Sequence, residues 1–330
     1  MFGDIMKIDK GCLLNNNLLW LSGFCKILLV IIIILILIPA VCFVCNRIRL
    51  KLEKHLLEQP IGEYVEVDGH KMCIYKEGEG IQTLLFLSGS GTPAPILDFK
   101  GLYSLLSDDY RIVVIEKFGY GFSDIVDTER SFDTILRQDR EALAKAGIEG
   151  PFILCPHSMS GLEAIMWAQD YPEEVEAIIG LDMVLPRTYD GYDFEKTLKF
   201  EKLVVAARKL GLLRFYYSDK ALPAALSKDE KALYRAIASR NTVNVDIINE
   251  GRAIIDAVRK IDSKQKPDIP MLMFISDGKE IRGINWADNH YKYASALTNA
   301  SVIELDCGHY VHYFEPELIA AKIREFISTL

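Results

Sequence analysis

The stretch 152–164 constrains the fold most, because an apolar strand passes into a helix there with almost no loop between them. Residues 152–155 read Phe-Ile-Leu-Cys, and helical spacing of apolar residues begins directly after Ser158. Such a sharp strand-to-helix turn holds its central residue in a strained backbone conformation and pushes that side chain outward. The backbone N–H of Met159 lies at the positive end of the new helix, where it can bind an anionic oxygen. The stretch therefore predicts a reactive serine whose side chain points outward at the edge of the sheet.

The turn departs from the usual Gly-x-Ser-x-Gly pattern, since Pro156 and Ser160 stand at the two glycine positions. Ser160 is small enough for close strand–helix contact. Pro156 removes a backbone donor that a strand end can spare. A serine without a chemical role in a β-to-α turn is the alternative interpretation, so the rest of the chain has to decide.

The N-terminal region contains nineteen consecutive residues without a charge, 27–45. At about 1.5 Å per residue this run approaches the ~30 Å thickness of a bilayer core. Basic residues follow it in place of a small-residue cleavage site, which favours a retained anchor over a signal peptide. We expect an N-terminal tail over 1–26, a single transmembrane helix over 27–46 and a linker over 47–62.

The basic residues that flank the apolar run favour one orientation in the cell membrane. Four follow it (Arg47, Arg49, Lys51 and Lys54) and three precede it (Lys7, Lys10 and Lys26). The positive-inside rule then predicts a cytoplasmic domain after the span. The net charge of −8 and the absence of a basic stripe in the globular part argue against a nucleic-acid partner.

Short apolar runs alternate with helical patterns over 63–330, after an opening hairpin. The expected parallel strands are 83–87, 111–115, 152–155, 175–181, 270–275 and 301–305. This alternation predicts a mostly parallel sheet covered by helices on both faces. The rhythm stops between about 186 and 266, where only helical spacing is found, so we expect a helical insertion there.

No cofactor or metal is indicated. Cys42 and Cys45 lie inside the apolar run without a second ligand pair, and Cys73, Cys155 and Cys307 are scattered over expected strands and loops as buried hydrophobes would be. A Gly-x-Gly sequence at 119–121 lacks the third glycine and the helix start of a dinucleotide site.

A histidine, His309, follows the last expected strand, on the sheet edge where Ser158 is expected. A serine on the turn, an acid after a later strand and a histidine after the last strand form the chain order of one enzyme superfamily. From about residue 63 onward the chain resembles the α/β-hydrolase superfamily. The residues that carry the resemblance are 156–161, Gly308 with His309, and 119–123.

The resemblance implies that Ser158 is the nucleophile and His309 the general base. It places the oxyanion hole at the backbone N–H groups of Met159 and Ser90. In such families the loop after the third strand usually begins His-Gly, whereas Ser88-Gly89 stands here, which leaves the aim of the donors open. His157 and His312 are expected to be structural.

Two aspartates compete for the role of the acid. The resemblance places the acid in many members about nine residues beyond the proline that opens the seventh strand, and here that position is Lys279, with Asp277 two residues earlier. The superfamily's other placement, at the end of the sixth strand, is occupied by Asp182. We favour Asp182 and keep Asp277 as the alternative.

The sequence thus predicts a membrane-anchored serine hydrolase of the α/β-hydrolase fold with a helical cap at about 186–266. Esters or thioesters of an apolar, lipid-like acyl group near the bilayer are the expected substrates, cleaved through an acyl-enzyme. A serine nucleophile does not indicate the dehalogenase or epoxide chemistry that an aspartate would. Amide or peptide hydrolysis, and a ligand-binding module without turnover, remain the alternatives.

Overall fold

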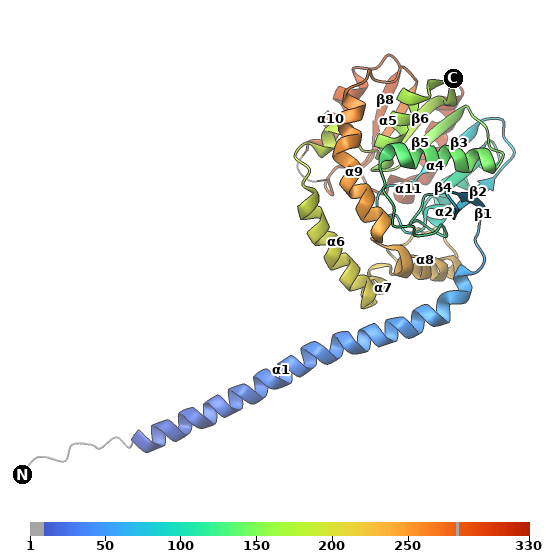
Figure 1. Cartoon of the computed structure of the whole chain (residues 1–330). Coiled ribbons are helices and arrows are strands. Elements are labelled where there is room, and N and C mark those ends of the chain that lie inside the picture. Colours follow the sequence, from blue (N-terminus) through green and yellow to red (C-terminus); the bar gives the residue numbers. More distant parts are fainter. Residues whose placement is uncertain (1–9, 282–283) are drawn as a thin grey trace, which may run out of the picture.

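The computed structural model describes residues 10–281 and 284–330, with side chains from residue 25 onward (Figure 1). Residues 1–9 of the expected tail, including Lys7, lie outside the described residues. The globular part begins at the first strand, Glu63, and it is joined to one long N-terminal helix (Figure 1).

A single eight-stranded sheet forms the centre of the globular part, with the order β1-β2-β4-β3-β5-β6-β7-β8. The strands are β1 (Glu63–Val67), β2 (His70–Glu77), β3 (Thr83–Leu87), β4 (Arg111–Glu116), β5 (Phe152–Pro156), β6 (Val175–Leu181), β7 (Met271–Ile275) and β8 (Ala300–Glu304). Strands β1 and β2 pair antiparallel with each other, β2 pairs antiparallel with β4, and all other pairs are parallel. The predicted fold, a mostly parallel sheet of the α/β-hydrolase type, is confirmed.

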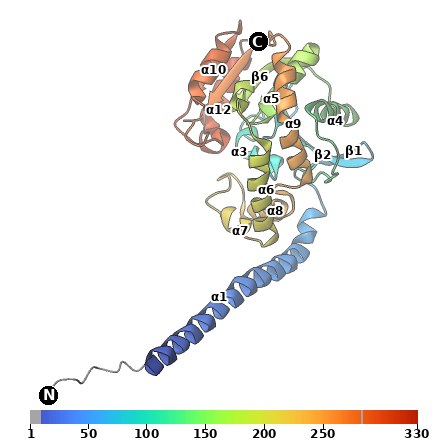
Figure 2. The same ribbon diagram turned by 60° about the vertical axis from the view of Figure 1, so that its left-hand side comes forward.

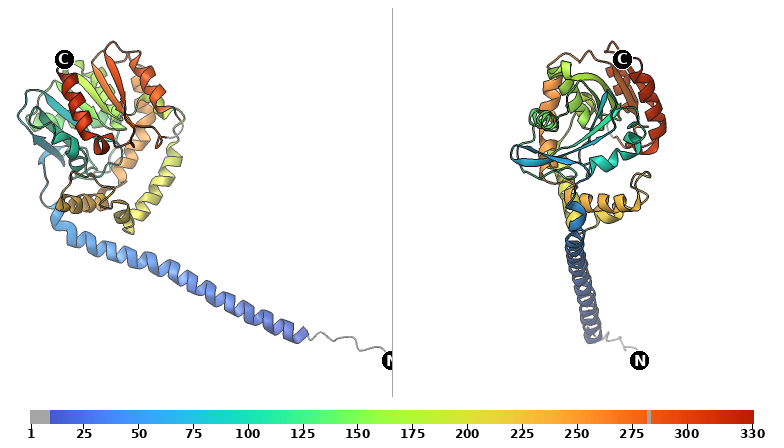
Figure 3. Two further views of the ribbon diagram at one scale, coloured as in Figure 1. Left: turned by 180° about the vertical axis from the view of Figure 1, so that it is seen from behind. Right: turned by 90° about the vertical axis from the view of Figure 1, so that its right-hand side faces the viewer.

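Helices cover both faces of this sheet, because successive side chains of each buried strand point to opposite faces. In β3, Leu85 joins one core cluster and Leu84 and Phe86 join the other. The first cluster packs under α4 (Phe132–Lys145), α5 (Ser160–Asp170), α9 (Val245–Asp262) and α10 (Trp286–Ala294). The second packs under α2 (Pro95–Asp98), α3 (Lys100–Tyr103), α11 (Val311–Phe314) and α12 (Pro316–Ile327). In the right-hand view of Figure 3 the sheet lies between orange α9 and dark red α12.

The helical insertion is present but narrower than the expected 186–266. It begins with a short 3₁₀ helix, η3 (Pro186–Tyr189), and continues with α6 (Phe194–Lys209), α7 (Leu213–Tyr216) and α8 (Lys228–Asn241). Helix α9 also falls inside the expected range, yet it packs against α4 and α5, which cover the sheet, and its Ile254, Ala257 and Ile261 join the same core cluster. The cap therefore consists of α6 to α8, and the apolar face of α9 belongs to the sheet layer.

The N-terminal helix α1 (Lys10–Leu52) is longer than the expected span at both ends. It contains 27–46 and is followed by η1 (Glu53–Leu57), so most of the expected linker 47–62 is helical. The reason is that the basic segment after the span consists of good helix formers and is held by contacts to the cap. Among the described residues, Cys25–Leu57 is the one helical stretch long and apolar enough to cross a membrane.

A buried ion cluster lies on the α4, α5 and α9 side of the sheet, and we define it as Lys117, Arg130, Asp139, Glu163 and Glu250. The ammonium group of Lys117 lies 3.2 Å from a Glu163 oxygen and 3.5 Å from a Glu250 oxygen. Arg130 lies 3.4 Å from Glu250. All five side chains are almost completely buried, so their charges interact through a medium of low polarity.

Candidate active site

Ser158 lies on a tight turn between β5 and α5, as the sequence predicts. Its backbone φ is +54°, a left-handed conformation that is rare for residues other than glycine. Gly89, on the loop after β3, approaches so closely that a Cβ atom on it would lie 2.6 Å from the Ser158 Cβ. Only glycine fits at position 89, and the turn therefore sits directly against the loop that carries Ser90.

Ser160 explains how the turn tolerates the loss of a glycine. Its buried hydroxyl lies 2.7 Å from the Leu87 carbonyl oxygen and 2.9 Å from the His157 carbonyl oxygen. The hydroxyl thus joins the end of β3 to the turn. Pro156 pairs in register with Leu87 at the last position of β5, where its missing N–H leaves the strand intact.

His309 is placed between Ser158 and Asp182. Its Nε2 lies 2.8 Å from the Ser158 hydroxyl, and its Nδ1 lies 2.6 Å from a carboxylate oxygen of Asp182. Both contacts are within hydrogen-bond range. The three side chains come from the turns after β5, β6 and β8, at the carboxyl edge of the parallel sheet. The structure thus brings together the serine, the histidine and the favoured acid.

Asp182 is completely buried and also has a left-handed backbone, with φ of +51°. Its Oδ1 accepts hydrogen bonds from the Ser276 backbone N–H at 2.6 Å and from the Trp286 indole N–H at 2.7 Å. These two donors fix the carboxylate and leave Oδ2 for His309. Sequence reasoning missed both, because they lie on the segment after β7, and no local pattern shows that it folds back over Asp182.

Asp277 is not brought to His309. Its carboxylate accepts from the Lys279 backbone N–H at 3.0 Å and forms an ion pair with the Lys279 ammonium at 2.6 Å. The Lys279 ammonium, together with the Lys279 backbone N–H, lowers the pKa of Asp277 below its usual value. Lys279 is directed to solvent. The loop nevertheless contacts the site, since Glu280 accepts a hydrogen bond from the His309 backbone N–H at 3.2 Å.

The two expected oxyanion donors are available for a ligand. Met159 is buried and directly precedes α5, and Ser90 follows the closely packed Gly89. Within the described part of the chain, neither backbone N–H donates a hydrogen bond to another residue. A free N–H at a helix start, such as that of Met159, stabilises negative charge, which is the chemistry an oxyanion requires.

His157 and His312 lie beside the site but outside the contact chain of Ser158, His309 and Asp182. The His157 Nε2–H donates to the His309 carbonyl oxygen at 3.2 Å. Burial, reinforced by the neighbouring His309 and His312, holds the His157 pKa well below its usual value. Burial likewise lowers the pKa of His312 to about 3. Both rings are therefore neutral near pH 7, and His157 supports the His309 loop.

The turn that carries Ser158 and the turn that carries Asp182 are joined through their backbones. The Val184 N–H donates to the Ser158 carbonyl oxygen at 2.8 Å. Gly161, in the first turn of α5, packs so closely that a Cβ atom would lie 2.2 Å from the Val184 carbonyl oxygen. Ser158 and Asp182 are consequently held at a fixed separation.

Asp98 connects the cap to the sheet domain near the site. Its carboxyl group accepts from the Tyr234 hydroxyl of α8 at 2.9 Å and from the Tyr313 hydroxyl of α11. Burial raises the pKa of Asp98 well above its usual value. In the described residues no group of three or more His, Cys, Asp and Glu side chains could hold a metal ion.

Comparisons with known proteins agree with this arrangement. The family model described as alpha/beta hydrolase fold matches residues 83–316. An uncharacterized protein of Bacillus subtilis (strain 168), YbdG, is 34% identical over 318 residues, which cover 92% of this chain and 96% of that protein.

More distant matches share the fold with different named activities. The cis-3-alkyl-4-alkyloxetan-2-one decarboxylase of Shewanella oneidensis is 23% identical over 80% of this chain and 87% of its own length. The crystal structure of a Bacillus megaterium epoxide hydrolase in complex with an inhibitor superposes with a TM-score of 0.65 at 18% identity, covering 81% of this chain and 100% of that one. With its family model matched over most of its length, the chain belongs to the alpha/beta hydrolase family.

Proposed function

We propose that the protein is a membrane-anchored serine hydrolase that cleaves a carboxylic ester or thioester through an acyl-enzyme. The observation that carries this proposal is the aligned contact chain from Ser158 through His309 to Asp182, with distances of 2.8 Å and 2.6 Å. A hydroxyl becomes a nucleophile when an adjacent base removes its proton, and this arrangement supplies such a base.

In the proposed reaction, the Ser158 oxygen attacks the substrate carbonyl while His309 Nε2 takes the hydroxyl proton. Asp182 accepts the Nδ1–H, which keeps the ring in the required tautomer and stabilises the imidazolium that forms. The Met159 and Ser90 N–H groups bind the oxyanion of the tetrahedral intermediate. His309 then gives its proton to the leaving alcohol or thiol, and water attacks the acyl-enzyme by the same steps in reverse.

The identity of the nucleophile separates this proposal from the named activities of the structural relatives. A likeness to the epoxide hydrolase at 18% identity concerns the fold alone. An aspartate on the turn would favour alkyl-enzyme chemistry of the epoxide or dehalogenase kind, whereas Ser158 supports acyl transfer. Esters and thioesters are favoured over amides because their leaving groups depart more easily.

The anchor is α1, in which the apolar run is exposed along its length. The basic residues after the run support a cytoplasmic position for the globular part. Protease added to intact cells should leave that part whole, and its digestion from outside would reverse the orientation. An enzyme held at the bilayer meets apolar acyl substrates there, so activity should rise with acyl chain length, and a preference for short soluble esters would contradict this.

A fluorophosphonate probe tests the nucleophile directly. We expect the wild-type chain to be labelled covalently and Ser158→Ala to remain unlabelled, because only an activated hydroxyl attacks such a probe. The matched control is Ser160→Ala, which removes the neighbouring buried hydroxyl and should still be labelled. Labelling that persists in Ser158→Ala, or a folded wild type that is never labelled, would favour a binding module.

The substrate class can be separated in the same preparation. A p-nitrophenyl ester and a p-nitroanilide with the same acyl group differ only in the bond cleaved. We expect turnover of the ester and little of the anilide. Comparable rates on both would assign the protein to the amide hydrolases of this fold.

A further inference from the structure

The turn between α6 and α7 is clamped to α1 at the residue where the apolar run ends. Asn46 follows Cys45 directly and is only 3% exposed. Its side-chain NH₂ donates to the carbonyl oxygens of Arg208 and Lys209, both at 3.1 Å, which are end carbonyls of α6. The Asn46 side-chain oxygen accepts from Arg214 at 3.2 Å. A buried amide with three partners fixes the cap against the helix.

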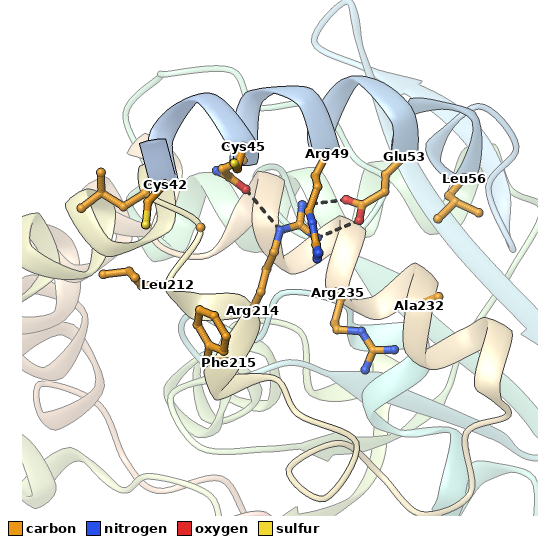
Figure 4. A pocket seen from close by; sticks show the side chains of 13 residues that line it. Cys42, Cys45, Arg49, Glu53, Leu56, Leu212, Arg214, Phe215, Ala232 and Arg235 are labelled. Atoms are coloured by element: carbon orange, nitrogen blue, oxygen red, sulfur yellow. Dashed lines mark hydrogen bonds and ion pairs between the residues drawn. The ribbon is translucent and has the colours of Figure 1, made fainter. Parts of the chain in front are cut away.

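A second contact, seven residues further along the chain at the start of η1, holds the same turn. The Arg214 guanidinium binds both carboxylate oxygens of Glu53, at 2.8 Å and 2.7 Å (Figure 4). Bidentate pairs of this kind set orientation as well as distance. Gly211 has φ of +75°, and a Cβ atom on it would lie 3.0 Å from Asn46. A side chain at position 211 would therefore press against Asn46, so the turn packs tightly on α1.

This clamp places part of the cap at the depth of the bilayer surface. A pocket of about 440 Å³ lies between α1 and the cap, and its walls include Cys42 and Cys45 on one side and Leu212 and Phe215 on the other (Figure 4). Cys42 is one helical turn before Asn46, which corresponds to about 6 Å along the helix at 1.5 Å per residue. If residues 27–45 cross the bilayer core, Leu212 and Phe215 lie at its boundary.

The same part of the cap exposes large apolar side chains, and we define these as the cap tip: Phe200, Leu203, Leu212, Phe215 and Tyr216. Phe215 is 83% exposed, Tyr216 69%, and Phe200 and Leu203 66% each. Soluble surfaces rarely gather so much apolar area without a partner. Figure 2 shows α6 and α7 at the end of the domain from which α1 departs.

The charges around the cap tip are mainly positive, although the chain as a whole carries −8. Helices α6 and α7 with the turn between them contain six basic and two acidic residues. The end of α1 adds Arg47, Arg49 and Lys51 next to them. Aromatic side chains surrounded by cations fit the interface of an anionic bilayer, where each cation contributes about 1 kcal/mol to binding.

We propose that the cap tip docks into the surface of an anionic membrane, so that the protein holds the bilayer by two elements, α1 and the α6–α7 turn. This inference rests on the proposed anchor role of α1. The occupant of the surface is the lipid bilayer, because the clamp at Asn46 sets the tip level with the end of the apolar run.

The test uses the full chain in vesicles of phosphatidylcholine and phosphatidylglycerol. Phe215→Trp introduces a fluorescent reporter at the tip, and lipids brominated near the carboxyl end of the acyl chain quench tryptophans at that depth. After subtraction of the wild-type signal, we expect blue-shifted emission and a clear loss of intensity in brominated vesicles. Quenching should be weaker in vesicles of phosphatidylcholine alone, which lack the anionic lipid. It should also be weaker in the mixed vesicles at high salt, because salt screens the attraction between the cations and the lipid.

The matched control is Tyr291→Trp. Tyr291 is an exposed residue of α10, which lies on the side of the domain away from α1 (Figure 1). Its emission should be water-like and unquenched. Equal, water-like emission from both reporters would overturn the docking. Carbonate extraction of the same vesicles separates the two proposals: a chain that stays in the membrane with an unquenched reporter at 215 overturns docking alone, whereas a released chain overturns the anchor and the docking together.

Discussion

The molecule buries two sets of ionisable side chains close to its sheet, and they differ in how their atoms are used. At the site, each oxygen of Asp182 has a defined donor, and the contact chain ends at Ser158, on the outside of a turn. In the buried ion cluster, both oxygens of Asp139 and one oxygen of Glu163 lack a partner among the described residues. Burial of charge alone therefore does not mark a reactive site.

The protonation of the cluster follows from its sealed position. Burial, with Glu163 beside it, raises the pKa of Asp139 well above its usual value, which favours the neutral form of the Asp139 carboxyl group. Burial alone would lower the pKa of Lys117, but Glu250 and Glu163 together raise it. The cluster thus holds α4, α5 and α9 together, whereas the site places the Ser158 hydroxyl against the His309 ring. Four substitutions test this division.

The largest expected effect concerns the acid at the site. Asp182→Asn keeps the shape but cannot hold His309 in the tautomer that faces Ser158, and such a loss costs about 10⁴-fold in kcat in the chymotrypsin case. Ester turnover and probe labelling would measure it, with circular dichroism as the folding control. Turnover close to that of the wild type would contradict the role of Asp182. It would also contradict the distinction between the site and the buried ion cluster.

The next effect concerns the cluster. Lys117→Met leaves Glu163 and Glu250 without their cation, and removal of one partner from a buried ion pair costs about 3–5 kcal/mol. Urea denaturation should show this loss, while the folded fraction keeps its turnover per molecule. The exposed Lys145→Met, which removes a surface ion pair with Glu141, should cost less than about 1 kcal/mol. A selective fall in kcat of folded Lys117→Met would move the cluster into the active site.

A smaller effect, dependent on pH, concerns the ring beside the site. His312 has a folded pKa of about 3, against about 6.5 in the unfolded chain. Between these values only the unfolded chain binds the proton, so stability is full above pH 6.5 and falls towards pH 3, by up to about 1.4 kcal/mol per unit.

His312→Phe should flatten this dependence, because neither ring nitrogen of His312 has a partner among the described residues and the ring stacks on Phe99. Thermal unfolding at a series of pH values measures it, with wild type as the reference. An unchanged slope would show that His312 is already charged in the folded protein and belongs with the polar groups of the site.

The smallest effect is expected for the acid that the site does not use. Asp277→Asn removes a surface contact to Lys279 and should leave the midpoint of urea denaturation almost unchanged. Turnover should match that of the wild type in the same ester assay. A collapse of kcat in this variant, beside normal turnover in Asp182→Asn, would transfer the acid to the segment after β7.

The parts of the site that the sequence predicted are those with a local pattern. Ser158 was found from a strand that passes directly into a helix, and His309 from its position after the last strand. The choice between Asp182 and Asp277 stayed open in the sequence, because it depends on how the segment after β7 folds. That segment brings Ser276 and Trp286 to Asp182 and turns Lys279 outward. Ser276 and Trp286 are each more than ninety residues from Asp182 in the sequence.

The fold was predicted in the same uneven way. The parallel sheet follows from apolar runs, which are visible one at a time. The extent of the cap could not be predicted, because α9 has the same helical spacing as the cap helices and only its packing against α4 and α5 distinguishes it. The helical course of the segment after the apolar run depends on Asn46 and Glu53, whose partners lie about 160 residues away.

The backbone hydrogen bond from Val184 to Ser158 makes one part of the site less sensitive to mutation than another. Of the substitutions at position 184 only proline removes the N–H, so any other side chain leaves this bond and the spacing of Ser158 and Asp182 in place. His309 is held differently, since its backbone is fastened by the Glu280 carboxylate and the His157 ring. A single substitution at Glu280 or at His157 would remove one of these contacts. Evolution or design can therefore change the position of His309 while the distance between Ser158 and Asp182 stays constant.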